Sequence, residues 1–245
     1  MNHHRLGITA LILLIFLTIL HAHQILRPVE SPLTPLAPVY FSGKIPSEIT
    51  HGSKDKKQII FTFDGGEGAQ SASVVLDVLQ KHNSQGTFFL TGKWVLRNPE
   101  LVKRMHQEGH EIYNHSLTHP HLPTLTDERI ALQLDTMEQI LLGLVGTSTK
   151  PYFRPPYGDY DERVLSVAAR QGYRAVMWTV DAGDWMESEG FTKEEVRARI
   201  FSHIKPGAII LMHIGDTITG AILDDVFTTI ESQGYSLVSL SKGME

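Results

Sequence analysis

Cysteine is absent from the 245 residues of this chain. This absence excludes a disulfide-stabilised scaffold and any metal site that is built from thiolates. Charge of either sign is also modest: the formal net charge is −5, and no run of lysine or arginine stands out. We therefore expect no nucleic-acid partner, because proteins that bind nucleic acids concentrate basic side chains on one face or in one run.

The sequence also lacks an apolar run of the roughly 20 residues that a membrane-spanning helix needs. The nearest candidate follows Arg5 and extends over 6–20, about 15 uncharged and mostly apolar residues. This length is long for the apolar part of a signal peptide and short for a membrane span. We predict that 1–24 is either a signal peptide or a membrane anchor. Either way the rest of the chain is exported, facing outside from the membrane or secreted into the periplasm or cell envelope.

Proline is concentrated just after this segment, at positions 28, 32, 35, 38 and 46. Such a density disfavours both helix and sheet and favours an extended spacer. We therefore predict a proline-rich linker over 25–56, followed by one catalytic domain over 57–241.

From residue 58 onward, short apolar runs alternate with segments of helical periodicity. The predicted strands cover 58–64, 86–91, 111–115, 152–154, 173–180, 208–213 and 235–240. The predicted helices cover 71–82, 99–108, 127–144, 161–171, 192–204 and 217–232. This alternation predicts an α/β fold with about seven parallel strands, which favours a closed or nearly closed barrel over the alternative of an open, doubly wound sheet.

Polar residues that can carry chemistry stand at the ends of five predicted strands: Asp64, His115, Arg154, Asp181 and His213. A barrel gathers the carboxyl ends of its strands at one mouth, so residues far apart in sequence become neighbours. The sequence therefore predicts a functional site at that mouth.

The residue types at this mouth suit hydrolysis of an amide or ester. His115 and His119, four residues apart, can direct both imidazoles at one divalent metal ion. Asp64 can take a proton from water as the general base, and His213 can give a proton to the leaving group. Arg154 can pair with Asp64, and Asp184 can pair with His213.

Five short motifs carry these residues in order along the chain. They are Thr62-Phe63-Asp64-Gly65-Gly66, His115-Ser116-Leu117-Thr118-His119, Arg154-Pro155-Pro156-Tyr157, Asp181-Ala182-Gly183-Asp184-Trp185 and Leu211-Met212-His213. With these motifs, the chain resembles the polysaccharide deacetylases of carbohydrate esterase family 4, which carry the NodB homology domain. The resemblance covers 57–240 and implies a distorted (β/α) barrel.

The resemblance also implies roles. Asp64 would be the general base, oriented by Arg154, and His213 would be the general acid, tuned by Asp184. His115 and His119 would be ligands of a divalent metal, zinc first and cobalt or nickel as alternatives. Three further residues would shape the substrate site: the backbone N–H of Tyr157 would help to hold the oxyanion, and Trp185 and Leu211 would wall the pocket for the acetyl methyl group.

The chain departs from the family pattern at one position. The family's third metal ligand is the second aspartate of the first motif, and here that residue is Gly65. Two substitutes are open: Glu67 could reach inward, or Asp64 could coordinate the metal directly.

We expect a metal-dependent hydrolase that removes N-acetyl groups from an amino-sugar polysaccharide, such as peptidoglycan, a chitin-like polymer or another surface glycan. An O-acetyl esterase acting on a polysaccharide is the alternative among enzymes. A catalytically dead glycan-binding module is the alternative outside them, because Gly65 supplies no ligand. The presence of Asp64, Arg154, Asp184 and His213 favours the enzyme. The sequence predicts no particular oligomeric state.

Overall fold

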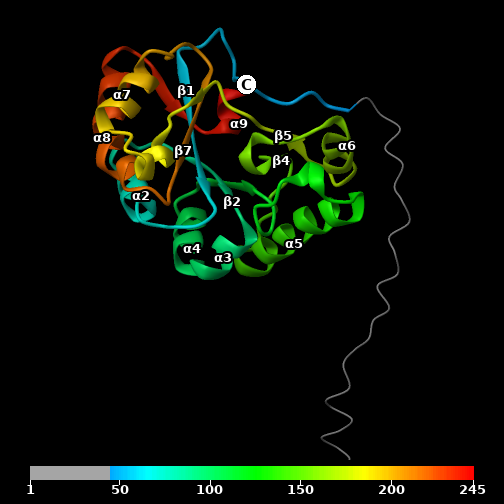
Figure 1. Cartoon of the computed structure of the whole chain (residues 1–245). Coiled ribbons are helices and arrows are strands. Elements are labelled where there is room, and N and C mark those ends of the chain that lie inside the picture. Colours follow the sequence, from blue (N-terminus) through cyan, green and yellow to red (C-terminus); the bar gives the residue numbers. More distant parts are fainter. Residues whose placement is uncertain (1–44) are drawn as a thin grey trace, which may run out of the picture. The chain divides into compact units, whose positions relative to one another are not determined.

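The computed structural model describes residues 45–245, and Figure 1 shows the arrangement of their helices and strands. Strand β1 (Gln58–Gly65) is central to the sheet, because it pairs with β2, β7 and β8. Successive side chains of a strand point to opposite faces. Ile59, Phe61 and Phe63 accordingly join the core between sheet and helices, while Ile60 joins a separate inner cluster. The side chain of Asp64, four residues after Ile60 on the same strand, points to the same inner face as Ile60.

All strand pairs in the described residues are parallel, in the order β5-β4-β3-β2-β1-β7-β6, with β8 added on β1. The remaining strands are β2 (Thr87–Leu90), β3 (Glu111–Asn114), β4 (Tyr152–Phe153), β5 (Arg174–Ala175), β6 (Val180–Asp181), β7 (Ala208–His213) and β8 (Ser236–Val238). The sheet curls into the distorted (β/α) barrel that the sequence predicts.

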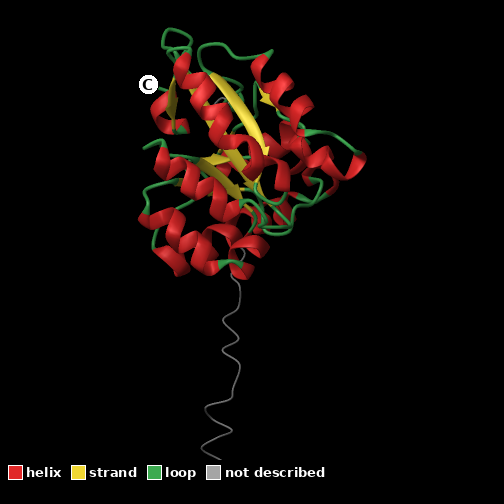
Figure 2. Cartoon of the chain, turned by 90° about the vertical axis from the view of Figure 1, so that its left-hand side faces the viewer, coloured by secondary structure: helices red, strands yellow, loops and turns green. Residues whose placement is uncertain are grey.

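Helices cover the outer face of the curled sheet, as Figure 2 shows. They are α2 (Ala72–Lys81), α3 (Gly92–Arg97), α4 (Pro99–Gln107), α5 (Asp127–Val145), α6 (Glu162–Arg170), α7 (Lys193–Phe201), α8 (Thr217–Ser232) and α9 (Leu240–Gly243). Three short 3₁₀ helices lie in the loops: η1 (Leu122–Thr124), η2 (Pro156–Gly158) and η3 (Asp184–Glu189).

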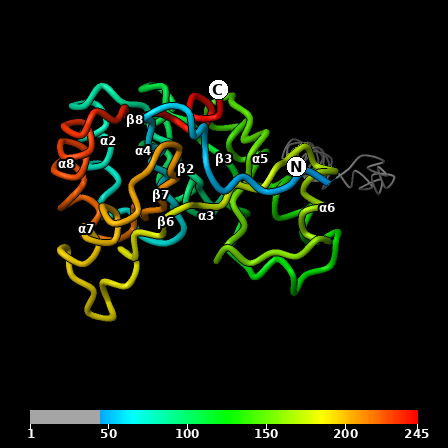
Figure 3. The backbone as a smooth tube through the Cα atoms, turned by 90° about the horizontal axis from the view of Figure 1, so that it is seen from above, coloured from blue at the N-terminus to red at the C-terminus, as the bar shows by residue number. Residues whose placement is uncertain are grey.

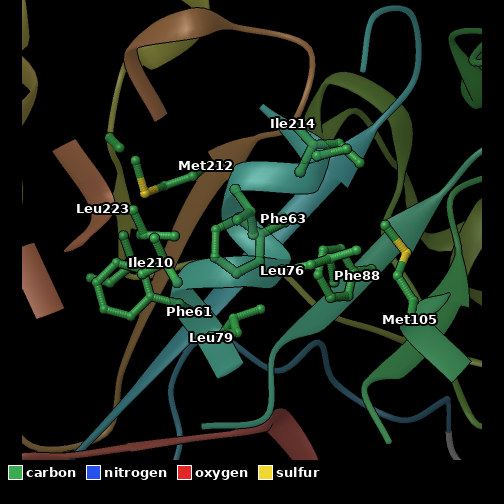
Figure 4. Close-up of a cluster of buried hydrophobic side chains, with 14 of the residues drawn as sticks. Phe61, Phe63, Leu76, Leu79, Phe88, Met105, Ile210, Met212, Ile214 and Leu223 are labelled. Atoms are coloured by element: carbon green, nitrogen blue, oxygen red, sulfur yellow. The ribbon is translucent and has the colours of Figure 1, made fainter. Parts of the chain in front are cut away.

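The largest apolar cluster lies between β1, β2 and β7 and the helices that cover them. Figure 4 shows Phe61 and Phe63 of β1 beside Leu76 and Leu79 of α2. Phe63 also stacks on Phe88 of β2, with ring centroids 5.3 Å apart. Burial of these rings supplies much of the hydrophobic stabilisation, since each aromatic side chain removes a large apolar area from water. This core holds the central strands rigidly beneath the site.

The chain before β1 takes part in closing the barrel. Ile49 is buried, forms a parallel bridge with Val176, and donates its N–H to the carbonyl of Ala175 at 2.8 Å. Ser53 donates to the carbonyl of Gly243 at 2.8 Å, and Figure 3 shows this blue segment passing beside the red C-terminal end. The last part of the predicted linker, from residue 45 on, therefore packs against the barrel.

One predicted strand, 173–180, is wrong as a single element, because it divides into β5 and β6. The carbonyls of Val176 and Met177 accept hydrogen bonds from the buried guanidinium of Arg154, both at 3.2 Å. Met177 then donates to Ile49, and Thr179 donates to Ile209 of β7. The chain thus changes partners midway, and a continuous ladder cannot form.

The other predicted strands and helices are present, with ends that differ by a few residues, and helices α3 and α9 were not predicted. Residues 1–44, with the predicted signal peptide or anchor and most of the linker, lie outside the described part. Over 45–245, no helix is both long and apolar enough to span a membrane.

Candidate active site

The predicted site residues meet in one cavity of about 880 Å³ at the carboxyl ends of the strands. Asp64 and His213 are directly opposite each other on the adjacent strands β1 and β7. The predicted residues that line the cavity are Asp64, Glu67, His115, His119, Tyr157, Trp185, Leu211 and His213. Arg154 and Asp184 are fully buried behind this lining.

Asp64 is held by an unusually buried arginine. The Nη1 of Arg154 donates to Oδ1 of Asp64 at 2.6 Å, and Nη2 donates to the hydroxyl of Thr62 at 2.9 Å. The guanidinium also lies over the ring of Phe89, 4.2 Å from its centroid. Burial of a charge costs free energy unless it is paired and hydrogen-bonded, and here both conditions are met.

The charge state of Asp64 follows from these contacts. Burial by itself raises the pKa of the Asp64 carboxyl, but the charge of Arg154, with the charge of His213 and the hydrogen bond from Arg154, outweighs burial and lowers the pKa below the usual 3.8. Asp64 is therefore ionised at neutral pH. Its Oδ1 is taken by Arg154, and its Oδ2 faces Nε2 of His115 at 3.5 Å.

His115 and His119 direct the same ring nitrogen at each other. The Nδ1 of His115 lies 2.8 Å from the carbonyl of Arg154, so it carries the hydrogen and leaves Nε2 as an acceptor. The two Nε2 atoms are 3.1 Å apart. Two nitrogens bound to one metal ion at about 2.1 Å would be separated by roughly 3.0–3.4 Å for angles of 90–109°.

The two imidazoles are also in the charge state that ligands need. Burial lowers the pKa of His115, and burial together with the neighbouring His115 lowers the pKa of His119 to about 4. Both rings are neutral at pH 7, and metal ligation requires neutral imidazole. The geometry and charge of this pair, and the tautomer of His115, fit a divalent cation.

Residue 65 supplies no third ligand for a metal ion, because glycine has no side chain. A Cβ added to Gly65 would lie 2.7 Å from Cδ2 of Leu90 and 3.0 Å from Cδ1 of Ile214, so apolar side chains close around this glycine. Asp64 Oδ2 is the carboxylate oxygen beside His115. Glu67 is exposed on the cavity wall, so its proposed role as a ligand stays a prediction.

Another group of possible ligands lies nearby within residues 45–245: one atom each of Asp184, His213 and Asp216 fall within 4.8 Å of one another. The two oxygens of Asp184 are already used. Oδ1 lies 3.0 Å from His213 Nδ1, and Oδ2 accepts from the His213 backbone N–H at 2.6 Å. We therefore interpret this group as an acid and its partners rather than as a second metal centre.

His213 is the cationic group of the site. Burial lowers its pKa, but the hydrogen bond and charge of Asp184 outweigh burial and raise the pKa to about 9. Thr219 donates its hydroxyl to Oδ2 of Asp184 and completes the support of that carboxylate. His213 is thus protonated at neutral pH, with Nδ1 on Asp184 and Nε2 free to serve the cavity.

The loop that carries the two histidines has unusual backbone geometry. Ser116 (φ 67°) and His119 (φ 61°) both lie in the left-handed region, which costs free energy for residues other than glycine. Side chains stabilise this loop: Asn114 Oδ1 accepts from the Ser116 N–H, and Gln133 Oε1 accepts from Leu117 and Thr118. Asn114 and Gln133 were missed by sequence reasoning, because a strand end and a mid-helix position carry no signal of this role.

Two aromatic side chains border the cavity. Tyr157 is 60% exposed, adopts φ 60°, and stacks on His121 with ring centroids 4.1 Å apart. Trp185 is 45% exposed, and its Nε1 lies 3.3 Å from both oxygens of Asp181. Leu211 is buried, lines the same cavity, and is opposite Asp181 in the register of β6 and β7. This border offers a flat, largely apolar rim to a ligand.

Asp216 also lines the cavity and is not among the predicted site residues. It stands at the N-cap position of α8, but its side chain makes no capping hydrogen bond. Burial and the neighbouring Asp184 raise its pKa to about 6. A partly protonated carboxyl at this wall was not predictable, because its cause is tertiary burial.

The chain is similar to known proteins in both sequence and fold. Residues 51–176 match the family model described as "Polysaccharide deacetylase". The peptidoglycan-N-acetylmuramic acid deacetylase PdaA of Bacillus subtilis (strain 168) is 39% identical over 189 residues, which cover 77% of this chain and 72% of that protein. A peptidoglycan-N-acetylglucosamine deacetylase of Bacillus cereus is 33% identical over 193 residues, 77% of this chain and 69% of that protein.

Solved structures give the same result. The structure of Bacillus subtilis PdaA, a family 4 carbohydrate esterase, superposes with a TM-score of 0.77 at 37% identity and covers 81% of this chain and 85% of that one. BA3943 of Bacillus anthracis, described as a family 4 pseudoenzyme, reaches a TM-score of 0.76 at 30% identity and covers 82% and 69%. On the match over more than half of its length, this chain belongs to the polysaccharide deacetylase family.

Proposed function

We propose that this protein is a metal-dependent deacetylase that hydrolyses the N-acetyl groups of amino sugars in peptidoglycan. One observation carries the proposal: an ionised carboxylate, Asp64, and a protonated imidazole, His213, face the same cavity beside a pair of neutral histidines. Two groups held in opposite protonation states at neutral pH are what general acid–base hydrolysis requires. The names of the two Bacillus deacetylases support peptidoglycan as the substrate.

His115 and His119 would hold the metal, with Asp64 Oδ2 or Glu67 as candidates for a further ligand. Zinc is the first choice for imidazole and carboxylate donors, and cobalt or nickel are alternatives. When bound, such a cation supplies positive charge that activates water and polarises the acyl oxygen.

The chain's own residues would divide the proton transfers. Asp64 takes the proton of the attacking water, and Arg154 keeps its carboxylate oriented through Oδ1. His213 donates a proton to the leaving amine through Nε2, because Nδ1 is held by Asp184. The carbon–nitrogen bond breaks, so the products are acetate and a free amino sugar.

Substrate placement would depend on the cavity walls. Leu211 and Trp185 would border the acetyl methyl group, and the backbone N–H of Tyr157 would donate to the developing oxyanion. The left-handed backbone of Tyr157 supports such a role, since strained residues persist where the surrounding fold requires them.

A second candidate function is a glycan-binding module without activity. Gly65 favours it, because the family's carboxylate ligand is missing, and a relative of similar fold is described as a pseudoenzyme. A mutant of that relative is described as having restored enzymatic activity. We favour the enzyme, because the four residues of the acid–base machinery are present. They form two hydrogen-bonded pairs, Arg154 with Asp64 and Asp184 with His213.

The N-terminal 24 residues would export the domain as a signal peptide or membrane anchor, and the proline-rich linker would place it at the cell envelope. Peptidoglycan lies in that compartment. Removal of residues 1–24 should therefore leave the protein inside cells, where fractionation detects it.

The deciding experiment is acetate release from purified peptidoglycan by the protein supplied with Zn²⁺ or Co²⁺. Mass spectrometry of muramidase digests then identifies whether glucosamine or muramic acid has lost its acetyl group. Acetylated xylan is the ester substrate that tests the alternative, an O-acetyl esterase activity. We expect acetate from peptidoglycan and none from an Asp64→Asn/His213→Ala control; binding of glycan without any acetate release would support the module instead.

A further inference from the structure

A buried carboxylate that forms no salt bridge with another residue of 45–245, although the charge of Lys150 acts on it, lies behind the His115–His119 loop. Glu138 of α5 is 5% exposed, and neutral donors surround it: the hydroxyl of Ser148 at 2.6 Å, and the backbone N–H and hydroxyl of Thr149 at 2.6 and 2.5 Å. Three short hydrogen bonds to ionised oxygens are strong enough to keep the carboxylate charged. They outweigh burial and lower the pKa of Glu138.

The hydrogen bonds continue from Glu138 toward the site. The hydroxyls of Thr149 and Tyr173 are 2.7 Å apart, and Nδ2 of Asn114 lies 3.1 Å from the Tyr173 hydroxyl. Their direction is fixed at one end, because an ionised carboxylate only accepts hydrogen bonds. Thr149 therefore donates to Glu138, Tyr173 donates to Thr149, and Asn114 donates to Tyr173.

The Asn114 amide has one orientation, which its contacts on both sides require. Nδ2 faces Tyr173 and also donates to the carbonyl of Leu134 at 2.8 Å, so Oδ1 must face the other way. There it accepts from the Ser116 N–H at 2.9 Å. Ser116 Oγ in turn accepts from the His119 N–H at 3.0 Å. Every step from Glu138 to the second histidine is thus a hydrogen bond in the described structure.

We propose that Glu138 is a positioning residue for the His115–His119 loop, acting through Thr149, Tyr173 and Asn114. The inference rests on the proposed metal role of these histidines. The loop needs such support, because both Ser116 and His119 hold left-handed backbones that an unsupported loop would leave. The negative charge of Glu138 strengthens its hydrogen bonds to Ser148 and Thr149, and so holds Thr149 and Tyr173 in place behind Asn114; a neutral amide would form weaker bonds at the same places.

The test is Glu138→Gln, which keeps the shape and removes the charge. The matched control is Glu111→Gln, because Glu111 also accepts only from hydroxyl and backbone N–H donors: Thr87 at 2.9 Å, Ser239 at 2.8 Å and Ser241. Glu111 opens β3 at the end of the barrel opposite the cavity. Both variants should lose some thermal stability.

Only Glu138→Gln should weaken metal binding, by about tenfold in the Co²⁺ dissociation constant read from the visible absorption of the bound ion. Asn114→Ala should weaken binding likewise, and adding Glu138→Gln to it should cause little further loss, because both act along one path. An unchanged Co²⁺ constant in Glu138→Gln, or full additivity in the double variant, would overturn the proposal.

Hydrogen exchange supplies a readout that does not depend on metal. Exchange should be measured for each variant at the same number of degrees below its own unfolding temperature. Under that condition, the backbone amides of 115–119 should exchange faster in Glu138→Gln than in Glu111→Gln. If the wild-type chain binds no Co²⁺, the proposed metal role fails, yet faster loop exchange would still support the positioning role. Equal exchange in the two variants would refute it.

Discussion

At the scale of single residues, the site depends on charges that are buried in pairs. Arg154 is fully buried and satisfies Asp64, Thr62 and the carbonyls of Val176 and Met177. Such a pair adds little net stability over an apolar core, but loss of one partner leaves an uncompensated buried charge. The proposed general base, Asp64, is therefore also a structural residue of the barrel mouth.

Asp64→Asn should impair both activity and stability. We expect kcat/KM for acetate release to fall by roughly 10²–10⁴-fold, since the general base is lost. The free energy of unfolding in urea should fall by about 3–5 kcal/mol, because Arg154 is left without its anion. Glu100→Gln, at the exposed pair with Lys103, should change neither quantity; equal effects at both positions would refute the special role of Asp64.

The pH dependence of the reaction should report His213. Activity needs His213 protonated, so kcat/KM should fall as pH rises through its pKa of about 9. On the acid side, activity needs ionised Asp64 and neutral His119, and the pKa of the latter is about 4. The profile should therefore be level near neutrality.

Asp184→Asn should move the alkaline limb of that profile. Burial lowers the pKa of His213, and without the Asp184 charge only the charges of Asp64 and Asp216 oppose burial, so the limb should shift from about 9 to lower pH. Rates from pH 5 to 10 measure this shift. A limb that stays near 9 in Asp184→Asn would exclude His213 as the acid.

At the scale of elements, the order of strands decides which residues become neighbours. Asp64 and His213 are 149 positions apart in the chain yet adjacent in register on β1 and β7. Ile49 has no part in the proposed chemistry. It forms a bridge with Val176 beside β5 and packs in the inner cluster. The chain before the first long strand is thus part of the barrel.

Ile49→Ala should test this closure. Truncation of a buried isoleucine should lower the free energy of unfolding by about 2–5 kcal/mol. Leu132→Ala, on the solvent-exposed side of α5, is the control. It should change the free energy of unfolding little, because the Leu132 side chain is 61% exposed. Both variants should keep kcat while folded. An unaffected urea midpoint for Ile49→Ala would show that this segment contributes nothing to the barrel.

The elements that sequence reasoning predicts best are those with long apolar periodicity. The run 58–64 and the helix 127–144 are both present with small shifts at their ends. The run 173–180 was misjudged, because Arg154, distant in sequence, takes the carbonyls that a strand would pair. Short α3 was missed because its six residues show too little periodicity.

The site itself was predictable where motifs carry it and not where tertiary packing does. Asp64, His115, His119 and His213 follow predicted strands, so a barrel brings them together. Glu138, by contrast, stands within a regular helix, and nothing in its sequence neighbourhood distinguishes it from a solvated carboxylate. Its role depends on Thr149 and Tyr173, which only the folded chain places beside it.

At the scale of the whole molecule, the chain has the family fold with an altered ligand set. The barrel agrees with the solved structure of a relative that is named a deacetylase, whereas Gly65 stands where the resemblance predicts a carboxylate in the first motif. Two imidazoles and one adjacent carboxylate oxygen of Asp64 are the donors that remain closest together. Weak metal affinity, rather than loss of chemistry, is the consequence we expect.

The most direct test is a titration of the metal-free protein with Co²⁺, with bound metal and acetate release from peptidoglycan measured on the same samples. We predict that acetate release rises in proportion to bound Co²⁺, saturates near one ion per chain, and is absent in His115→Ala/His119→Ala. Full activity in the metal-free protein, or no acetate at any occupancy, would contradict the account.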